Sequence, residues 1–302
     1  MATDNSKRIA KLLKYVRVPE GSKVRLKKHD PTWTGSITDE KEASALLEEG
    51  IRRLAKQQGK LYAQDTRSLL LIFQAMDAAG KDGTIRHVMS GVNPQGCQVF
   101  NFKAPSEEEL DHTYLWRSMK TLPERGRIGI HNRSYYEEVL VTKVHPEILA
   151  SQRLPDDLKD DGVWKRRYRE INNFERYLVD NGTVILKFFL NVSKDEQKRR
   201  FLARIDEDDK NWKMSVNDVK ERTFWSDHMR AYEEMFSNTS TKRAPWHIIP
   251  ADNKWFTRLA VAAIIYDALE RLDLQYPSLT PEKKAELQRV RKLLIAEKEK
   301  EE

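Results

Sequence analysis

Aspartate, glycine and lysine lie close together in the stretch Ala75–Thr84, a combination typical of sites that handle phosphate groups. The apolar run Leu69–Phe73 precedes it and predicts a short buried strand. The segment after Lys81 predicts a helix, so the order is strand, loop, helix. Gly80 would let the backbone approach an anion, the N–H groups of the helix start would point at it, and Lys81 would add a mobile positive charge. The stretch therefore predicts a phosphate-binding loop, with a plain tight turn as the alternative.

The loop departs from the pattern G-x-x-x-x-G-K-[ST] at two positions. Ala75 replaces the first glycine, which costs little if φ is not positive there. Asp82 replaces the hydroxyl residue that normally holds Mg²⁺, although Thr84 is near. Asp82 has an equally weighted alternative role, as a favourable charge in the first turn of a helix. The phosphate-binding residues predicted in this loop are Ala79, Gly80, Lys81, Asp82, Gly83 and Thr84.

Asp77 lies inside the predicted loop, where a carboxylate would repel bound phosphates. A divalent cation between the carboxylate and the phosphates would remove that repulsion. Asp77 is therefore interpreted as a metal ligand or as the group that orients the attacking oxygen.

A second polar cluster follows the predicted strand Arg127–His131 directly. Asn132 offers a neutral oxygen where phosphotransfer sites usually carry an acidic metal ligand. Arg133 can bind a phosphate with two parallel hydrogen bonds. Glu137 follows four residues later and would share a helix face with Arg133, so that with Asp77 it could complete an oxygen-ligand Mg²⁺ site.

Both charged residues of this cluster have a purely structural alternative. Ser134 and Glu137 have the spacing of a capping box, in which Glu137 would only close the start of a helix ending near Leu149. Arg133 could form an ordinary surface salt bridge.

Composition places the chain among soluble globular proteins with a highly charged surface. It has 302 residues, of which 39% are hydrophobic and 33% charged, and its formal net charge of +7 favours an acidic partner. A single cysteine, Cys97, excludes an intrachain disulfide and a cysteine metal cluster. The apolar runs are too short to span a bilayer, and the N-terminus carries no apolar signal region. We therefore expect a cytoplasmic protein without a membrane partner.

Strands alternate with helices along the chain, which predicts an α/β fold with a mostly parallel sheet and its site at the carboxyl ends of the strands. Helices are expected near residues 7–16, 39–58, 106–120, 134–149, 163–179, 193–206, 215–236, 254–270 and 281–302. The expected strands are 69–73, 97–102, 127–131, 183–190 and 246–250.

We expect a single domain over residues 1–302 with distinct parts at its two ends. Residues 1–37 form a basic arm, for which a solvated surface segment is the favoured interpretation. Residues 278–302 carry a charged C-terminal helix. The arm and this helix are the candidate contact elements between copies of the chain.

Several motifs resemble the polyphosphate kinase 2 family, over roughly residues 10–275. Asp77–Gly83 and Asn132–Glu137 carry the resemblance most specifically, and Ala244–Trp246, Ile249–Lys254 and Asn211–Lys213 add to it. The resemblance implies a P-loop kinase-like three-layer α/β fold similar to thymidylate kinase, with a mostly parallel five-stranded sheet. It also implies a helical lid, over residues 193–240.

The resemblance implies reversible phosphoryl transfer between inorganic polyphosphate and AMP or ADP, with Mg²⁺, or Mn²⁺ in its place. Asn132, where other members have aspartate, resembles the subgroup that phosphorylates both nucleoside monophosphates and diphosphates. Asp77, Lys81, Arg133 and Glu137 are then the expected catalytic residues, and Asp77 and Glu137 the metal ligands. The expected nucleotide-binding residues are Asn132, Asn211 and Lys213.

A polyanionic donor needs a basic track, and each member of such a track has a solvated surface charge as its alternative. The expected polyphosphate-binding residues outside the loop are Lys103, Arg117, Arg133, Arg199 and Arg204, and the wider track adds Arg127, Arg200, Lys210 and Lys213.

Two rival functions remain at this point. One is an ATP-dependent nucleoside monophosphate kinase of the same fold. The other is a basic nucleic-acid-binding protein, against which stands the absence of an interleaved basic and aromatic motif. The expected partners are polyphosphate, AMP, ADP, ATP, guanine nucleotides and a second copy of the chain in a homodimer or homotetramer, with no nucleic acid.

Overall fold

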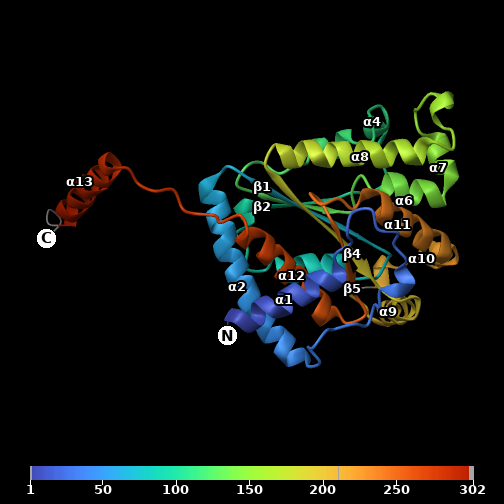
Figure 1. Ribbon diagram of the computed structural model, residues 1–302, viewed down its shortest axis with the longest axis horizontal. Coiled ribbons are helices and arrows are strands. Elements are labelled where there is room, and N and C mark those ends of the chain that lie inside the picture. The colour runs from blue at the N-terminus through green and yellow to red at the C-terminus, as the bar shows by residue number, and fades with distance from the viewer. Residues whose placement is uncertain (1, 210, 299–302) are drawn as a thin grey trace.

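Five parallel strands form one sheet at the centre of the computed structural model, which describes residues 2–209 and 211–298 (Figure 1). The sheet order is β2-β3-β1-β4-β5. The central strand β1 is buried along its whole length, which explains why its sequence is continuously apolar rather than alternating. The strands are β1 Ser68–Ala75, β2 Cys97–Asn101, β3 Ile128–Asn132, β4 Thr183–Asn191 and β5 Trp246–Pro250. The predicted α/β fold with a parallel sheet is confirmed.

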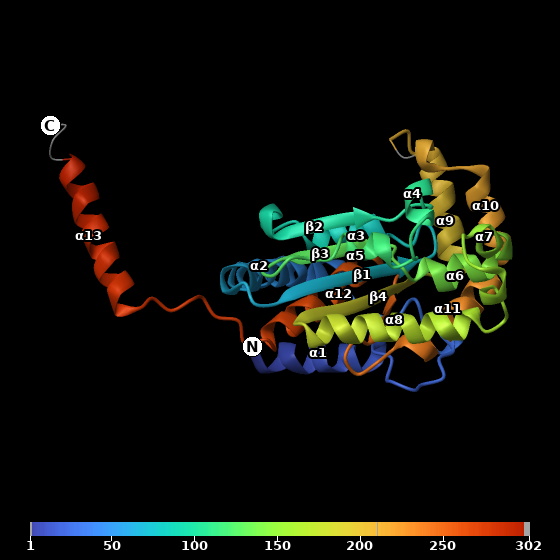
Figure 2. The ribbon, with the colours of Figure 1, turned by 90° about the horizontal axis from the view of Figure 1, so that it is seen from above.

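Helices cover both faces of the sheet and give the fold three layers (Figures 1 and 2). One layer contains α1 Ala2–Val16, α2 Glu40–Gln64, α3 Lys81–Val88 and α12 Lys254–Glu270. The opposite layer contains α6 Glu137–Val144, α8 Val163–Asp180 and α11 Trp225–Thr239.

The N-terminal arm is packed against the body, so the favoured interpretation of it as a solvated segment is wrong. Val16 and Val18 are buried, and the N–H of Val18 donates to the carbonyl of Trp246 in β5 (2.9 Å). Further along, the N–H of Leu26 donates to Glu233 of α11 (2.7 Å). The interpretation rested on the positive charges of the arm and overlooked the valines and leucines between them, which are part of the core.

Three predicted helices are interrupted in the structure. The helix expected over 215–236 is divided into α10 Val216–Glu221, a 3₁₀ turn at Arg222–Phe224 and α11. The helix expected to end near Leu149 stops at Val144, because Pro146 cannot continue it and starts α7 Pro146–Ser151. The helix expected over 106–120 becomes α4 Glu107–Leu110 and α5 Trp116–Met119, although the capping box predicted at Ser106 is present.

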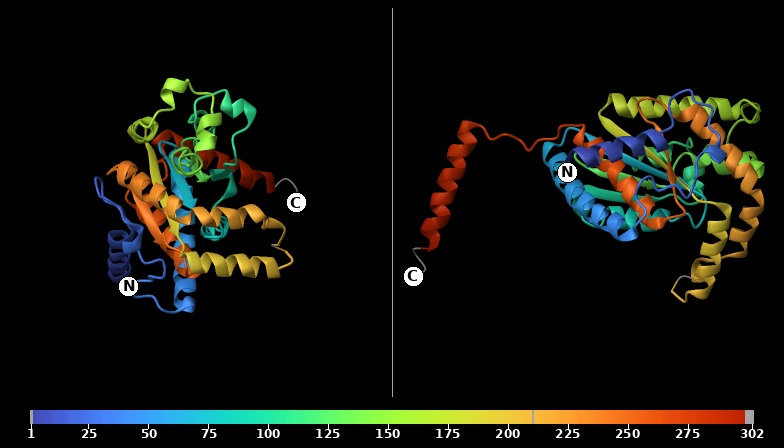
Figure 3. Two further views of the ribbon diagram at one scale, coloured as in Figure 1. Left: turned by 90° about the vertical axis from the view of Figure 1, so that its right-hand side faces the viewer. Right: turned by 60° about the horizontal axis from the view of Figure 1, so that its bottom comes forward.

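Two parts of the chain extend beyond the body (Figure 3). The helix α9 Lys194–Asp206 and the α10–α11 segment form a hairpin that projects past the end of the sheet. The C-terminal helix α13 Pro281–Lys298 stands apart at the end of an extended segment. No helix within the described ranges combines the length and the apolar character that a membrane span requires.

Candidate active site

The carboxyl ends of β1 and β3 bring the two predicted polar clusters together. The two strands are adjacent, with Phe73 paired to Asn132, so the loop after β1 lies beside the turn after β3. The N–H of Arg133 donates to the carbonyl of Phe73 (3.0 Å) and holds the turn to the strand. Two segments about 55 residues apart in sequence therefore form one site, as parallel sheet topology requires.

The loop after β1 has the backbone conformation of a tight anion-binding turn. Gly80 precedes the first helical residue of α3 with φ of +104°, a conformation that a side chain rarely tolerates. Ala78 also has positive φ (+59°), which is a strained conformation for a residue with a Cβ. Ala75 is not among the positive-φ residues and ends β1, so the structure confirms that alanine is tolerated there.

Lys81 lies at the start of α3 and is held by the loop itself. Its Nζ donates to the carbonyl oxygen of Ala75 (3.0 Å). The ammonium group is therefore held in place, whereas the sequence had suggested a mobile charge. Burial lowers the pKa of Lys81, whereas the nearby carboxylates of Asp77, Glu137 and Asp82 raise it. A bound phosphate would compete with one carbonyl for this ammonium.

Asp77 and Arg133 form an ion pair across the site. Nη2 of Arg133 lies 3.2 Å from Oδ1 of Asp77, and both side chains remain partly exposed. Arg133 has φ of +61°, a second strained residue at this edge of the sheet. The predicted salt-bridge alternative is thus observed, but the pair lies inside the candidate site rather than at a remote surface.

Glu137 faces the site and is no capping residue. It is the first residue of α6, whose N-cap is Tyr136, and the hydroxyl of Ser134 instead accepts from the N–H of Tyr136 (3.2 Å). The predicted capping box is therefore wrong. With its amide nitrogen turned to the carboxylate, Gln74 donates to Oε1 of Glu137 (2.8 Å). Burial raises the pKa of Glu137, and Arg133 and then Lys81 oppose that rise.

Asn132 connects the loop to the edge strand β2. Its Nδ2 donates to Oδ1 of Asp82 (2.7 Å) and to Oδ1 of Asn101 (2.7 Å). Asp82 lies in the first turn of α3, so its helix-start role is realised, and Asn132 fixes its side chain as well. Thr84, two residues further, is buried in α3.

Two side chains of α9 donate hydrogen bonds to backbone carbonyls of the phosphate loop. Nη1 of Arg200 donates to the carbonyls of Ala79 (2.8 Å) and Ala78 (3.1 Å), and Nη2 donates to the carbonyl of Ala251 after β5 (2.6 Å). Gln197 donates to the carbonyl of Asp77 (2.9 Å). The sequence placed Arg200 only in the general basic track. Its spacing of four from Glu196, which it contacts at 2.7 Å, predicts an ion pair within the helix and not its contact with the loop.

The remaining predicted polyphosphate residues lie in several environments. Arg117 is buried, donates to the carbonyl of Lys103 (2.8 Å) and stacks its guanidinium over Phe102. Arg199 is exposed and paired with Glu196 at 2.6 Å. Arg117 and Arg199 thus have protein partners that a ligand would meet or replace.

The other predicted residues lie on the projecting hairpin. Arg204 is in the last turn of α9. Asn211 and Lys213 form a 3₁₀ turn beyond it, and Asn211 is exposed. The side chain of Lys213 and all of Lys210 fall outside the described part of the chain. In this conformation the hairpin tip is well separated from the loop after β1 (Figure 2).

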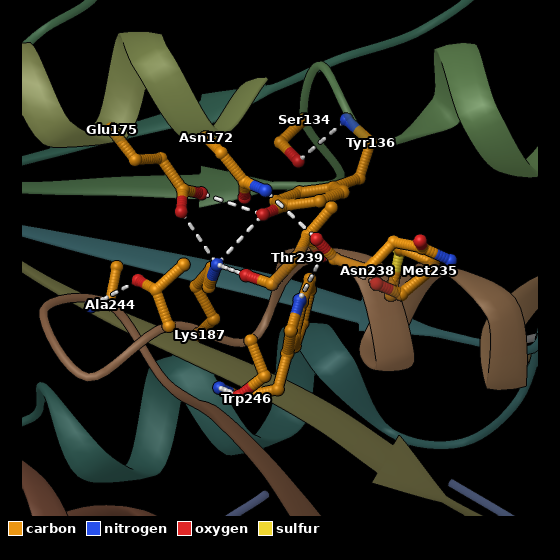
Figure 4. Close-up of polar contacts among 12 residues, drawn as sticks. Ser134, Tyr136, Asn172, Glu175, Lys187, Met235, Asn238, Thr239, Ala244 and Trp246 are labelled. Atoms are coloured by element: carbon orange, nitrogen blue, oxygen red, sulfur yellow. Dashed lines mark hydrogen bonds and ion pairs between the residues drawn. The ribbon is translucent and has the colours of Figure 1, made fainter. Parts of the chain in front are cut away.

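A fully buried polar network supports the turn that carries Arg133 and Glu137 (Figure 4). Nζ of Lys187, in the middle of β4, donates to Glu175 of α8 (2.6 Å), the hydroxyl of Tyr136 (2.8 Å) and the carbonyl of Thr239 (2.8 Å). Glu175 also accepts from the hydroxyl of Tyr136 (2.7 Å). This network joins β4, α8, the start of α6 and the end of α11, and the sequence analysis did not find it.

Tyr232 of α11 is a further residue that the sequence analysis missed. It is buried, and burial followed by the charges of Glu137 and Asp77 raises the pKa of its hydroxyl. Tyr232 thus brings the α10–α11 segment into electrostatic contact with the site.

The assembled groups are suited to phosphoryl transfer. Backbone N–H groups at the start of α3, Lys81 and Arg133 provide positive charge for phosphate oxygens. Asp77 and Glu137 provide carboxylate oxygens, the donors that Mg²⁺ prefers, so the residues present fit that ion.

Comparison with known proteins agrees with this geometry. The family model "Polyphosphate kinase 2 (PPK2)" matches residues 37–277. An "ADP-polyphosphate phosphotransferase" of Rhodopseudomonas palustris is 52% identical over 93% of this chain and 98% of its own length. An "AMP/ADP-polyphosphate phosphotransferase" of Meiothermus ruber is 43% identical over 88% of this chain and 96% of its own.

A solved structure gives the same answer for the fold. The crystal structure of polyphosphate kinase 2 from Arthrobacter aurescens matches with a TM-score of 0.85 and 42% identity, over 93% of this chain and 96% of that one. Sequence and structure therefore agree that the chain belongs to the polyphosphate kinase 2 family.

Proposed function

We propose that this chain transfers a phosphoryl group between inorganic polyphosphate and ADP or AMP, reversibly, with Mg²⁺ or Mn²⁺ as the ion. One observation carries the proposal: Lys81, Arg133, Asp77 and Glu137 converge at the carboxyl edge of the sheet, beside a loop with the backbone of a phosphate site. Family membership supports polyphosphate rather than a nucleoside triphosphate as the donor. The ATP-dependent nucleotide kinase and the nucleic-acid-binding protein are not favoured.

The chain's own residues would position phosphates and neutralise their charge. Loop N–H groups and Lys81 would hold the transferred group, and Arg133 would leave Asp77 to meet charge that develops in the transition state. Bound at Asp77 and Glu137, Mg²⁺ would supply neutralisation of phosphate oxygens. Arg200 would keep the loop in shape through its hydrogen bonds to the carbonyls of Ala78 and Ala79.

The hairpin of α9, α10 and α11 would act as the lid that excludes water from the donor. Gln197 and Arg200 sit at its base, against the phosphate loop, while Arg204 and Asn211 lie toward its tip. A rotation about the base would bring these outer residues toward bound substrate. Arg199, Arg204, Asn211 and Lys213 would then contact polyphosphate or nucleotide.

Acceptance of both AMP and ADP is proposed to depend on Asn132. Its amide lies 2.7 Å from Asp82, and Asn132→Asp would place two carboxylates at that distance. Like charges so close disfavour joint ionisation unless a proton or cation intervenes. We expect Asn132→Asp to change the ratio of AMP to ADP turnover and to raise the Mg²⁺ requirement, and an unchanged ratio would remove Asn132 from acceptor choice.

The direct test supplies polyphosphate, Mg²⁺ and either ADP or AMP, with no ATP, and follows ATP by luminescence and ADP by chromatography. We expect ATP from ADP, and ADP followed by ATP from AMP. No product above the enzyme-free control would contradict the proposal. Reaction of AMP only when ATP is supplied would establish the nucleotide-kinase rival instead.

Two further substrate and assembly proposals extend this function. GDP and GMP are proposed as alternative acceptors, which the same assay tests by chromatography.

A homodimer or homotetramer is proposed because α13 stands off the body and exposes Leu287, Leu293 and Leu294. Light scattering of the full chain and of Leu294→Glu tests this, and an unchanged monomeric mass in both would contradict it.

A further inference from the structure

Two histidines and a glutamate form a compact cluster where α10 and α11 of the lid meet the turn between α6 and α7. His145 lies between α6 and α7, Glu221 ends α10, and His228 lies in the first turns of α11. The Nε2 atoms of His145 and His228 each lie 3.1 Å from Oε2 of Glu221. The three side chains are largely buried but not sealed, with 14%, 27% and 9% of their surfaces exposed.

The donor atoms have the composition and spacing of a metal centre. One ligand atom from each residue lies within 4.8 Å of the other two, close enough for one ion to contact all three. Two imidazoles and one carboxylate are a common three-ligand set for Zn²⁺, with a fourth position left for water. Imidazole nitrogen favours Zn²⁺ and similar transition ions, whereas Mg²⁺ favours oxygen, so this cluster differs in chemistry from Asp77 and Glu137.

The surroundings of His145 supply a second indication. Metal binding through Nε2 requires the tautomer whose proton is on Nδ1, and such a proton is normally held by a carboxylate or carbonyl. Oε1 of Glu147 lies 3.4 Å from Nδ1 of His145 and is the carboxylate placed to accept a hydrogen bond from it.

We propose that His145, Glu221 and His228 bind a transition-metal ion of the Zn²⁺ class and thereby clamp the lid to the α6–α7 corner. A cluster that only exchanges hydrogen bonds needs no second carboxylate on the outer ring nitrogen, whereas a metal site gains affinity from it.

The clamp is connected to the phosphate loop through two side chains. Arg222 follows Glu221 directly and donates to Oε1 of Gln197 (2.6 Å), and Gln197 donates to the carbonyl of Asp77 (2.9 Å). An ion at Glu221 would therefore restrain the base of the lid close to the site. The binding itself does not depend on the proposed reaction.

The test uses the full chain, stripped of metal by a chelator and without substrates. Co²⁺ is added alone and its visible absorption is recorded, because a four-coordinate histidine and carboxylate site gives an intense band. Zn²⁺ is then added as a competitor, and thermal midpoints are measured with Zn²⁺ and with Mg²⁺. We expect one equivalent of Co²⁺ to bind, Zn²⁺ to displace it, and Zn²⁺ to raise the midpoint by binding the folded state.

Variants separate this site from adventitious binding. His145→Gln and Glu221→Gln should lose the band and the Zn²⁺-induced shift, and Glu147→Gln should weaken binding about tenfold. His112→Gln is the matched control, since His112 is exposed and stacks on Trp116 outside the cluster. Absence of the band in the wild-type chain, or equal binding by wild type and His145→Gln, would overturn the proposal.

Discussion

Two charged pairs flank the turn after β3, and they differ in almost every physical respect. Lys187 and Glu175 are 2.6 Å apart with 0% and 2% of their side chains exposed. Arg133 and Asp77 are 3.2 Å apart with 45% and 37% exposed. The first pair has all its partners inside the protein, so it can serve only the fold. The second keeps open faces where a ligand can replace one member.

The energetic expectations differ in the same way. Removing one partner of a buried pair leaves an uncompensated charge and costs about 3–5 kcal/mol, whereas an exposed pair is worth about 0–1 kcal/mol. The comparison shows that the buried Lys187 network stabilises the turn after β3 through Tyr136. Arg133 and Glu137 therefore need not stabilise that turn. The charges at the open edge are therefore available for chemistry.

The largest expected effect is on stability, from Lys187→Met. The free energy of unfolding should fall by about 3–5 kcal/mol, because Glu175 is left buried without its cation. The measurement is urea denaturation followed by tryptophan fluorescence. A paired variant, Lys187→Met with Glu175→Leu, should recover much of the loss because no lone charge remains. A single variant as stable as wild type would break the comparison.

Lys81→Ala should have a large effect on activity and a small effect on stability. Loss of this charge should raise the barrier to phosphoryl transfer by about 3 kcal/mol or more. The free energy of unfolding should fall by only about 1 kcal/mol, since one hydrogen bond to Ala75 is lost. Initial rates beside urea denaturation check both values. Full activity of the variant would show that the loop is a plain tight turn with no role in phosphate binding.

The free energy of unfolding should also depend on pH, through a buried histidine beside Lys187. Burial lowers the pKa of His247 to about 4, beside the carbonyl of Lys187 at 3.1 Å. Because the folded pKa lies below the unfolded value, stability is complete above about pH 6.5 and is lost as pH falls toward about 4.

For His247 this linkage amounts to about 2 kcal/mol of unfolding free energy between about pH 7.5 and pH 5. Urea denaturation across that range measures the slope, and His247→Asn should flatten it even if the variant is less stable throughout. An equal slope in the variant would assign the acid sensitivity to other groups.

The smallest stability effect is expected from Glu137→Gln. Its contact with Gln74 is replaceable and it caps nothing, so stability should stay within about 0.5 kcal/mol. Activity should fall at limiting Mg²⁺ and recover partly as Mg²⁺ rises, because losing the carboxylate charge weakens Mg²⁺ binding at the site. Asp77→Asn should shift the same way and further. A Mg²⁺ titration of rate that is unshifted in both variants would contradict the metal role.

Local sequence patterns were sufficient to predict the sheet. Most of the strands are short, largely apolar runs, and such a run in an alternating α/β chain has few alternatives. Helix boundaries were less well predicted. No Gly or Pro marks the 3₁₀ turn at Arg222–Phe224, where Arg222 contacts Gln197. The arm was misjudged because its burial depends on β5, more than 200 residues away in sequence.

The site was predictable where its residues follow strands and hidden where they do not. Asp77 and Arg133 closely follow strand ends, and Lys81 begins the helix after the same loop, so sheet topology brings them together. Arg200 contacts carbonyl oxygens of the loop, and a carbonyl leaves no trace in side-chain identity. Lys187 is a single cation in an apolar strand, and only the packing of α8 on β4 shows that Glu175 is its partner.

Phosphorus NMR of one reaction mixture tests the central claim most directly. Polyphosphate, ADP, Mg²⁺ and the enzyme are incubated without any other nucleotide, and all phosphorus resonances are followed together. Direct transfer predicts that the γ-phosphate resonance of ATP grows as polyphosphate is consumed, with little orthophosphate, and that Lys81→Ala nearly abolishes this growth. Release of orthophosphate without ATP, or equal ATP formation by Lys81→Ala, would contradict the account.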